Sequence, residues 1–506
     1  MPHSIPKELQ IGSRVRIGED RATIKYIGSV GNTKGEWLGV EWDDAARGKN
    51  DGTHEGKSYF TCQYPTSGSF IRYHPDKVQI GRSFLEALRE KYLTEDDTMP
   101  YDKEADRGEI YVGNIKFETV GFQKIQQSQS NLGNLKVVGL AEQDIAYCNP
   151  SDELLDLRIE DLDLSRNLIS NWKTIVDIVS KLTNLKILRL NQLRFSKSLD
   201  VDLQTLSFPN IHTLTLNQTL IEWNDIEPIL HLFPNLQDLQ LGCNKIKDLK
   251  PFNNQYQVQL TCLNLENNLI SDWQQILRLS DIFPNLDTLF LNDNRISTIT
   301  ATTATSTAAP ALISNLKYLR IEQNRINDWK SIDAFNAYTN LRRLKCKGNP
   351  IFADLDTDTQ LAHIVGRIKH VDTVNGTTIT KRERIDFERY FLKKAATDQD
   401  RLHNKRFQEL CLLHGNPSAA YIQQNQPTPS LLKNRLTELT LSLYRADDHE
   451  MNEFIQSHLD QPISIYQLPP TMRTHTESMQ KKCLPTMTIR NLKSLIQPRK
   501  RAARGS

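Results

Sequence analysis

The sequence predicts a multidomain protein: a small β-barrel-like module, then an α/β solenoid with a helical cap, and last a partial α+β segment. Three observations support this order: a glycine- and aromatic-rich stretch near the N-terminus, a leucine pattern that repeats through the middle, and an alternation of apolar and polar residues near the end. At 506 residues the chain is too long for one simple core. The expected boundaries are 1–82 for the first module, 83–150 for a linker and the N-terminal solenoid cap, 151–352 for the repeats, 353–415 for the C-terminal cap helices, 416–434 for a second linker and 435–506 for the last segment.

Composition excludes several classes of protein. The chain has 63 Lys and Arg against 61 Asp and Glu residues, a balance that argues against a broadly basic nucleic-acid binder. Hydrophobic residues at 38% and charged residues at 25% fit a soluble globular protein. No apolar run is long enough to span a bilayer, and residues 1–8 lack the apolar core of a signal peptide. Seven scattered cysteines without a CxxC pair indicate free thiols in a reducing cytosol.

The first module contains a pentapeptide with the composition of a ligand-binding loop. Two glycines bracket a cation, an amide and a carboxylate; the residues are Gly48, Lys49, Asn50, Asp51 and Gly52. Glycine lets the backbone turn tightly and approach a ligand, and the ammonium and amide groups are donors suited to an acidic chain end. The aromatic residues that supply flat apolar walls nearby are Trp37, Trp42, Phe60 and Phe70. The pattern predicts a groove for a peptide tail that ends in an aromatic carboxylate. The alternative is that these aromatics only form a core, and we assign Trp42 to the core because so small a module needs one.

Residues 12–80 resemble a CAP-Gly domain. The matching stretches are 12–15, 35–41, 48–52, 59–60 and 68–72. The resemblance implies a small module that grips C-terminal Glu-Glu-Tyr/Phe tails, notably that of α-tubulin. It implies that Lys49 and Asn50 meet the carboxylates of the tail and that Trp37, Phe60 and Phe70 line the slot. The remaining candidates for the tail site are Gly48, Asp51, Gly52 and Arg72. The loop from Cys62 to Gly68 is one residue longer than the family pattern leads us to expect.

The middle of the chain repeats the pattern Leu-x-Leu-x-x-Asn-x-Ile eight times from Leu162 onward, with 24 to 30 residues between repeats. Such a period indicates leucine-rich repeats with one short parallel strand per coil, because the leucines of one coil need neighbouring coils to be buried. The Asn side chain satisfies backbone groups where the strand turns away. Two repeats carry Leu193 and Thr219 at the Asn position, so we expect the Asn ladder to be interrupted there.

One residue between the spine leucines of each coil is predicted to face out of the concave sheet, because side chains alternate along a strand. These residues are Asp163, Arg189, Thr215, Gln240, Asn264, Phe290, Arg320 and Lys345, and the last coils add Arg343 and Lys347. The face therefore becomes cationic toward its C-terminal end, which favours an acidic protein partner. The candidates for partner binding are Arg189, Phe290, Arg320, Arg343, Lys345 and Lys347. The alternative is a solvated face with no partner.

Three further sequence features belong to the predicted solenoid. Four tryptophans recur shortly after the Asn position, and we assign them to packing between coils on the convex side; they are Trp172, Trp223, Trp273 and Trp329. The low-complexity stretch 298–309 is expected to be a flexible loop. Residues 371–376 and 382–392 have the features of a helical cap.

The last quarter of the chain is predicted to contain a helix at 400–407, a linker around 426–430 and a half-buried strand at 436–443. Residues 484–496 read as a strand end, a turn and the start of a helix, and the segment resembles the first half of a ubiquitin-like fold. Half of such a domain leaves apolar faces uncovered, so we expect either poor order or a truncated sequence. The basic residues 499–504 are interpreted as a solvated tail rather than a localisation signal.

The order of these parts resembles the family of tubulin-folding cofactor E. That resemblance implies a cytoplasmic, cytoskeleton-associated chaperone that binds α-tubulin and, together with other tubulin-folding cofactors and β-tubulin, assembles or takes apart the αβ-tubulin heterodimer. It implies no cofactor, no nucleic acid and no membrane. Two alternatives remain open: an adaptor at microtubule ends that uses the same groove, and a scaffold of the ubiquitin–proteasome pathway.

The sequence does not predict an enzyme. Residues 56–58 would suit the end of a phosphate-binding loop, but position 51 lacks the first glycine, and no GxGxxG, HExxH or GxSxG motif occurs. His363 and His370 lie seven positions apart, and two histidines do not make a zinc site.

Overall fold

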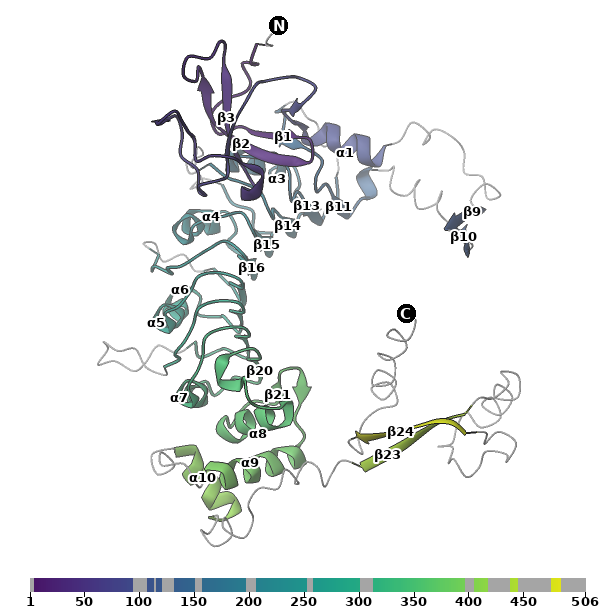
Figure 1. Cartoon of the computed structure of the whole chain (residues 1–506), viewed down its shortest axis with the longest axis vertical. Helices are drawn as coiled ribbons and strands as arrows, with labels where there is room; N and C mark the ends of the chain where they lie inside the picture. The colour runs from purple at the N-terminus through teal and green to yellow at the C-terminus, as the bar shows by residue number, and fades with distance from the viewer. Residues whose placement is uncertain are drawn as a thin grey trace. The chain divides into compact units, whose positions relative to one another are not determined.

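The computed structural model describes residues 4–93, 107–112, 115–120, 132–150, 157–196, 206–252, 258–300, 313–395, 405–416, 437–444 and 475–483. Two compact units divide the chain at residue 391, and each is described by itself. The first unit holds the N-terminal module and the solenoid, and Figure 1 shows the solenoid strands following one another from β11 to β21.

The N-terminal module is a five-stranded antiparallel sheet. Its strand order is β6-β3-β2-β1-β7, and the strands are β1 (Arg14–Ile17), β2 (Asp20–Gly28), β3 (Trp37–Trp42), β6 (Gly68–Ile71) and β7 (Val78–Gln79). A short turn of helix η1 (Ala45–Arg47) and a hairpin of β4 (Thr53–His54) and β5 (Lys57–Ser58) lie between β3 and β6. Val15, Ile24, Leu38 and Val40 are fully buried, and Trp42 is 3% exposed in the same core. The indole of Trp42 donates to Ser69 Oγ at 2.9 Å, which confirms the assignment of this tryptophan to the core.

A helix then closes the start of the solenoid. Strand β8 (Arg82–Ser83) pairs in parallel with β12 (Ile145–Tyr147), and α1 (Phe84–Tyr92) follows at once. Ser83 and Glu86 form a reciprocal capping box that fixes the first turn of α1. Phe84 and Leu88 are fully buried in the core that the solenoid leucines form. Between α1 and the first repeats lie β9 (Arg107–Val112), β10 (Ile115–Val120), the 3-10 helix η3 (Leu132–Asn134) and β11 (Val137–Gly139).

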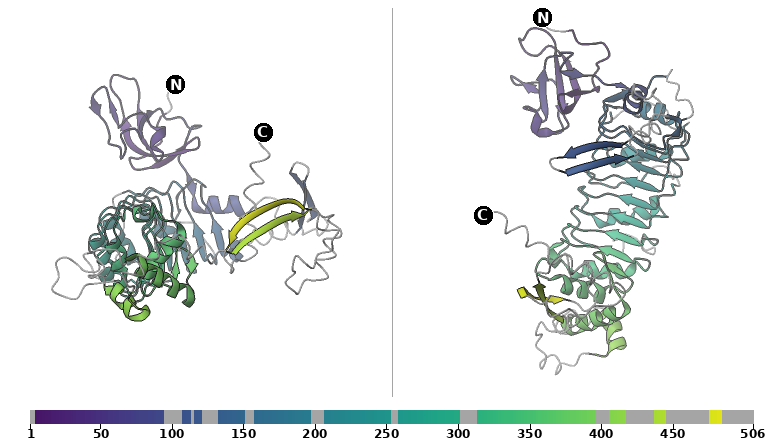
Figure 2. Two further views of the ribbon diagram at one scale, coloured as in Figure 1. Left: turned by 60° about the horizontal axis from the view of Figure 1, so that its bottom comes forward. Right: turned by 90° about the vertical axis from the view of Figure 1, so that its right-hand side faces the viewer.

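The solenoid is built on one sheet of eleven strands, which runs from β11 through β13–β20 to β21 and β22. The eight repeat strands are β13 (Asp161–Asp163), β14 (Ile187–Arg189), β15 (Thr213–Thr215), β16 (Asp238–Gln240), β17 (Cys262–Asn264), β18 (Thr288–Phe290), β19 (Tyr318–Arg320) and β20 (Arg343–Lys345). Their central leucines stand opposite one another, as Leu162 does to Leu188 and Leu188 to Leu214, and all are buried. Figure 2 shows these strands as a parallel ladder, so the predicted leucine-rich solenoid is confirmed.

Buried asparagines join successive coils. The amide nitrogen of Asn268 donates to the carbonyls of Leu241 and Leu265, both at 3.0 Å. It also donates to Glu266 O at 3.2 Å, and the side-chain oxygen accepts the N–H groups of Asn244 and Ile246 at 3.0 and 2.9 Å, so one side chain bonds five backbone groups. The interruption predicted for the ladder occurs: Leu193 is fully buried and apolar. Thr219 restores one of the hydrogen bonds that an asparagine would make at this position, because its hydroxyl donates to Leu216 O at 2.9 Å.

Short helices cover the side of the coils away from the strands (Figure 1). They are α3 (Trp172–Val179), η5 (Trp223–Asp225), α4 (Ile226–His231), α5 (Trp273–Leu277), α6 (Leu279–Ile282), α7 (Trp329–Asp333) and η6 (Ala334–Ala337). Each of the four recurring tryptophans is the first residue of its helix, and Trp172, Trp223 and Trp273 are buried. Trp172 stacks on Phe195 at 4.8 Å between ring centroids, which confirms the predicted packing role. The residue before the tryptophan caps the helix in three cases, as where Asp272 accepts the N–H of Gln274.

The C-terminal cap combines helices with a hairpin. Its elements are η7 (Pro350–Phe352), α8 (Thr357–Arg367), β21 (Thr373–Val374), β22 (Thr377–Thr378) and α9 (Lys381–Ala395). Residues 371–376 were expected within a helical cap, but they extend the solenoid sheet and then turn back. Asn375 and Gly376 have φ of 52° and 89°, and such a pair of positive angles makes a tight hairpin turn instead of a helix.

The second unit contains α10 (Lys405–His414) and an antiparallel pair, β23 (Thr437–Tyr444) and β24 (His475–Cys483). The strand predicted at 436–443 is therefore present, and the predicted helix at 400–407 is described only from Lys405 onward. The loop at 301–309, the linker at 417–434 and the strand–turn–helix predicted at 484–496 lie outside the described residues, so the ubiquitin-like fold stays a prediction. Within the described part of the chain, every helix is too short or too polar to cross a membrane.

Replacing Asn268 by alanine would remove the side-chain partner of the Leu241 carbonyl and of the N–H groups of Asn244 and Ile246, whereas the Leu265 carbonyl would still accept from Asn294. We expect Asn268→Ala to lower the free energy of unfolding by about 3 kcal/mol. Urea denaturation followed by tryptophan fluorescence would measure this loss, since the buried Trp273 lies in the same coil as Asn268. Asn285→Ala is the matched control, because Asn285 is exposed and donates only to the side chain of Gln259 among its side-chain contacts. A loss for Asn268→Ala no larger than that of the control would contradict the proposed role of the ladder.

Candidate functional site: an aromatic face beside a glycine-bracketed turn

One side of the module sheet carries the predicted tail site. Leu38, Val40 and Trp42 point from β3 into the core, so Trp37 and Gly39 point outward. Gly39 pairs with Phe70 on β6 and with Tyr26 on β2. These pairings place aromatic side chains on both sides of a position that has no side chain. We call the outward set of Tyr26, Trp37, Tyr59, Phe60, Phe70 and Arg72 the aromatic face.

Gly39 lets an aromatic ring lie directly on the sheet. A Cβ atom at this position would stand 2.4 Å from Cε1 of Phe60 and 2.9 Å from Cβ of Tyr26, so no other residue fits without displacing them. Phe60 is consequently 8% exposed although it lies outside the strands. Its ring meets that of Phe70 at 5.3 Å between centroids, and Tyr59 meets Phe70 at 5.5 Å, both edge to face. The result is one continuous aromatic cluster.

The side chains of Trp37 and Arg72 form a cation–π contact at the end of this cluster. The guanidinium carbon of Arg72 lies 3.9 Å from the centroid of the Trp37 ring. Arg72 Nη1 also donates to Glu36 O at 3.0 Å, and the indole of Trp37 donates to Thr33 Oγ1 at 2.7 Å. These bonds fix the plane of the indole and keep a permanent positive charge on its face.

The pentapeptide 48–52 is fastened to the free edge of β6. The backbone N–H groups of Lys49 and Asn50 donate to Gly68 O at 2.8 and 3.1 Å, and Gly68 N donates to Asn50 O at 2.7 Å. Gly52 has a φ of 95°, and a Cβ there would lie 2.1 Å from Phe60 O. A Cβ at Gly48 would lie 2.1 Å from Thr66 O. The glycines are therefore required for the turn to approach both β6 and Phe60.

The polar side chains of the pentapeptide differ in what they can offer a ligand. Asn50 Oδ1 accepts the N–H of Gly52 at 3.0 Å, so the amide NH₂ is the group left to donate outward. Lys49 is exposed, and its ammonium stands on a backbone that is itself fixed. Asp51 accepts the N–H of Thr53 at 3.0 Å, and hydrogen bonds from Thr53 hold the pKa of its carboxyl below the usual value. Asp51 therefore serves the turn and adds negative charge, while Lys49 and Asn50 supply donors.

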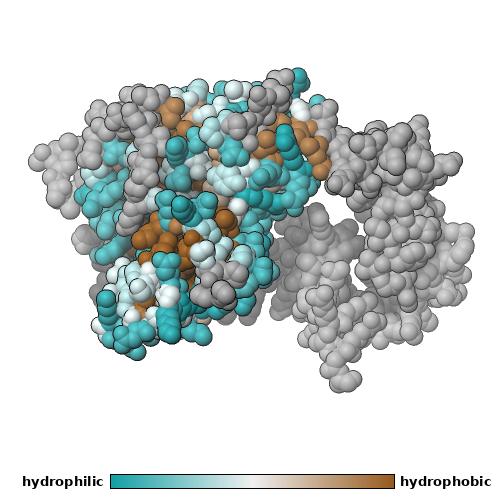
Figure 3. Space-filling view, turned by 90° about the horizontal axis from the view of Figure 1, so that it is seen from above, coloured by the Kyte–Doolittle hydropathy of each residue, from teal (hydrophilic) through white to brown (hydrophobic). Residues whose placement is uncertain are grey.

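Sequence reasoning missed three contributors to this face: Tyr26, Tyr59 and Lys57. Tyr26 and Tyr59 extend the aromatic cluster, with their centroids 5.3 Å apart. Lys57 is exposed and places its ammonium 5.1 Å from the centroid of Tyr59, so a further cation borders the rings. Tyr59 and Lys57 could have been identified from the sequence, because they lie close to the predicted site residue Phe60. Figure 3 views the unit from the side of the module, and hydrophobic patches lie there among hydrophilic residues.

The concave candidates separate into two groups. Arg189 lies on β14, far along the sheet from the others, and forms an ion pair with Asp161. On β18–β20 the rings of Phe290 and Tyr318 are 5.5 Å apart. The guanidinium carbons of Arg320 and Arg343 lie 5.2 and 4.3 Å from those two rings, respectively. We call Phe290, Tyr318, Arg320 and Arg343 the concave ladder.

Other predicted concave positions also differ in exposure. Lys347 is exposed and Lys345 is half-buried, so both can add charge beside the ladder. Asn264 was expected to face out, but it is 6% exposed because its amide donates to Gln240 Oε1 at 2.8 Å and its oxygen accepts the N–H of Glu266. The described residues contain no group of three or more His, Cys, Asp or Glu side chains that could hold a metal ion. His363 stacks on Trp329 at 4.8 Å between ring centroids, which is a packing contact.

Comparison with known proteins finds relatives of the first module and of most of the chain. The family model for the CAP-Gly domain matches residues 11–75. Tubulin-specific chaperone E of Bos taurus is 32% identical over 91% of this chain and 87% of its own length. Tubulin-specific chaperone E of Xenopus laevis is 34% identical over 85% of this chain and 83% of its own length. A solved structure described as the Bik1 CAP-Gly domain with an ETF peptide from Bim1 is 41% identical over 12% of this chain and 75% of that chain, with a TM-score of 0.12.

Adding one methyl group at Gly39 should disturb the aromatic face. We expect Gly39→Ala to lower the free energy of unfolding by about 2 kcal/mol, because the new Cβ overlaps the Phe60 ring. Gly139→Ala is the control, since a Cβ at Gly139 meets nothing within 4 Å. Combining Gly39→Ala with Phe60→Leu should cost less than the sum of the two single changes, because the smaller side chain relieves the overlap. Thermal unfolding of the four variants measures this coupling, and strict additivity would contradict the contact.

Proposed function

The chain belongs to the family of tubulin-specific chaperone E, and on that premise we propose that it holds α-tubulin at two places, the tail on the aromatic face and the body on the concave ladder. The observation that carries the proposal is the fastening of Lys49 and Asn50 to β6, directly beside a ring cluster made of Phe60 and Phe70. A fixed pair of donors next to apolar rings suits a tail that ends in an aromatic residue and a carboxylate.

The chemistry of each contact follows from the groups present. The ammonium of Lys49 and the amide of Asn50 donate to the carboxylates of the tail, and such charge-assisted hydrogen bonds are the stronger kind. Arg72 adds a further positive charge beside the Trp37 ring. The terminal ring of the tail packs against the edges and faces of Phe60, Phe70 and Trp37. Because the backbone of Lys49 and Asn50 and the rings are held by hydrogen bonds and packing, their ordering costs little entropy on binding.

The concave ladder offers a second, separate surface. Arg320 and Arg343 each lie over an aromatic ring, so their guanidinium groups stand beside apolar surface on this part of the sheet. Arg320 is also paired with Glu322 at 3.3 Å, so Arg343, Lys345 and Lys347 supply the excess of positive charge. Flat, cationic and partly aromatic surfaces suit an acidic patch on a folded protein. We assign this surface to the body of α-tubulin.

Two sites on one chain explain a chaperone that needs no chemical step. Binding of the tail raises the effective concentration of the tubulin body near the ladder, so that joint binding exceeds either contact alone. If β-tubulin cannot stay bound while α-tubulin occupies both sites, binding shifts the heterodimer toward separation. If β-tubulin can bind to α-tubulin held in this way, the same binding supports assembly of the heterodimer. The proposal places the protein with tubulin in the cytoplasm, where other tubulin-folding cofactors join the complex.

Removing the two donors tests the tail site. We expect Lys49→Ala with Asn50→Ala to weaken binding to tubulin by at least about tenfold, because two charge-assisted hydrogen bonds are lost. Binding to tubulin from which the α-tail has been cleaved should be the same for the variant and the wild type. Lys77→Ala, another exposed lysine of the module, is the control and should change nothing. If the double variant binds tailed tubulin as tightly as the wild type, the donors are not part of the site.

Removing the guanidinium groups of the ladder tests the body site. We expect Arg320→Ala with Arg343→Ala to weaken binding to tail-less tubulin by about tenfold and to reduce its dependence on salt concentration. Arg325→Ala is the control, because Arg325 is exposed in the same coil but lies beyond its strand. Biolayer interferometry at two salt concentrations gives both quantities. Equal affinities for the double variant and the control would assign the body contact to another surface.

A further inference from the structure

The module and the solenoid are joined by a very short connection. Only Ile80 and Gly81 separate β7 from β8, which is already part of the solenoid through its pairing with β12. Gly81 has a φ of 86°, and a Cβ there would lie 2.6 Å from Ala146 Cβ and 2.7 Å from Asp144 O. Arg16 of β1 forms an ion pair with Asp144 at 2.6 Å. The module therefore leaves the solenoid through a packed turn and not through a free linker.

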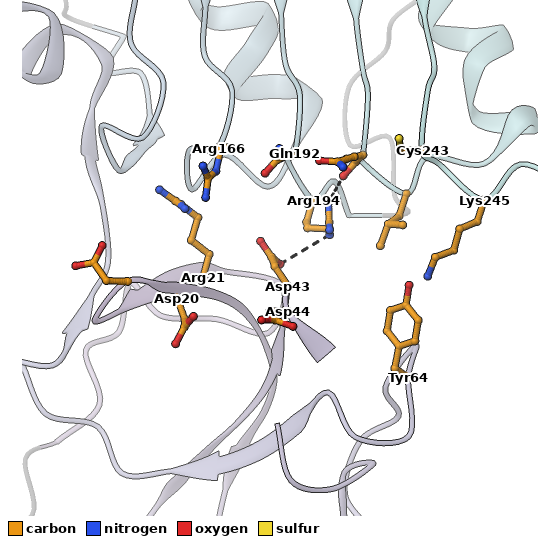
Figure 4. A pocket seen from close by; sticks show the side chains of 13 residues that line it. Asp20, Arg21, Asp43, Asp44, Tyr64, Arg166, Gln192, Arg194, Cys243 and Lys245 are labelled. Atoms are coloured by element: carbon orange, nitrogen blue, oxygen red, sulfur yellow. Dashed lines mark hydrogen bonds and ion pairs between the residues drawn. The ribbon is translucent and has the colours of Figure 1, made fainter. Parts of the chain in front are cut away.

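A second contact lies away from the connection, around a cavity of about 390 Å³ lined by residues of both the module and the coils. Arg194 points from the solenoid toward Asp43 of the module, with 3.8 Å between Nε and Oδ1 (Figure 4). The backbone carbonyls of Leu193 and Gln218 accept hydrogen bonds from the same guanidinium and hold it in this direction. Burial lowers the pKa of Arg194, and the nearby carboxylate of Asp43 opposes that effect.

A third contact pairs a cation with a ring. The ammonium of Lys245 lies 3.6 Å from the centroid of the Tyr64 ring (Figure 4). Tyr64 belongs to the loop 62–68, which leads from β5 to β6. This loop is fixed inside the module: Gln63 N donates to Glu41 at 2.5 Å, and the N–H and hydroxyl of Ser67 donate to Tyr64 O at 3.1 and 3.0 Å. The loop thus presents Tyr64 to the solenoid on a support that these hydrogen bonds hold in place.

One pair of like charges opposes these contacts. Arg21 of the module and Arg166 of the solenoid face each other across the cavity (Figure 4), and burial together with Arg166 lowers the pKa of Arg21. Glu142 pairs with Arg166 and reduces this repulsion. Apart from the Arg16–Asp144 pair at the connection, Arg194 and Lys245 are the solenoid groups that attract the module across this cavity.

We propose that Arg194 and Lys245 form a docking surface on the solenoid whose partner is the N-terminal module of the same chain, bound through Asp43 and Tyr64. Docking makes the aromatic face and the concave ladder parts of one body. The functional consequence rests on the proposed two-site grip: a fixed separation between the two faces keeps the effective concentration of the second contact high. When the docking surface is disrupted, the module can turn about Ile80 and Gly81, and the effective concentration of the second contact decreases.

Hydrogen exchange of the full chain tests docking without any ligand. We expect Arg194→Glu with Lys245→Glu to speed exchange in residues 61–68 by at least about fivefold, because the like charge repels Asp43 and the cation over Tyr64 is lost. Lys245→Arg keeps a cation over the ring and should preserve the slow exchange. Lys247→Glu with Lys250→Glu is the matched control, because both lysines are exposed in the same coil. Equal exchange in the docking variant and the control overturns the proposal.

Binding measurements then test the consequence. The docking variant should bind an isolated peptide with an acidic, tyrosine-ended tail within about twofold of the wild type, because the donors are held by bonds inside the module. It should bind whole tubulin at least about fivefold more weakly. Faster exchange with unchanged affinity for whole tubulin would overturn the coupling between the two faces. Failure of the wild type to bind the peptide would instead contradict the proposed function, while the exchange experiment would still decide docking.

Discussion

The contact between Phe60 and the bare backbone of Gly39 is the constraint on which the aromatic face depends. With no side chain at that point of β3, a ring from outside the sheet packs against it and contacts Phe70, which in turn contacts Tyr59. The same ring sets the position of Gly52, whose backbone passes so close to Phe60 that a Cβ has no room. The donors of the pentapeptide therefore stand beside the rings because of packing, before any ligand is present.

Periodic features of the fold were predictable from the sequence, because they depend on residues a fixed distance apart. The leucines that line the solenoid, the asparagines that join its coils and the helix-starting tryptophans all lie where the repeat places them. Thr219 shows the limit of such reasoning: it breaks the pattern in sequence, yet its hydroxyl restores one of the missing hydrogen bonds. Asn264 shows another limit, since its burial depends on the particular neighbour Gln240.

The candidate site was predictable only in part. The pentapeptide and Phe60 were recognised from composition and family pattern, but Tyr26 was missed because an irregularity in β2 between Ile24 and Tyr26 shifts the simple alternation of its strand. Contacts between the module and the solenoid have no local signal at all: Arg16 meets Asp144 across 128 positions of sequence. Such pairs follow from the tertiary arrangement, and they give Tyr64 of the loop 62–68 a contact that its sequence did not indicate.

The central claim is that the aromatic face recognises a tail by its terminal ring and its carboxylates together. The most direct test is to titrate the full chain with two peptides, one ending in Glu-Glu-Tyr and one lacking only the final tyrosine, and to compare their affinities by calorimetry. We predict that loss of the tyrosine weakens binding by at least about tenfold, because a ring packed on Phe60, Phe70 and Trp37 is removed. Equal affinities for the two peptides would contradict the account, since attraction between charges alone would then explain the binding.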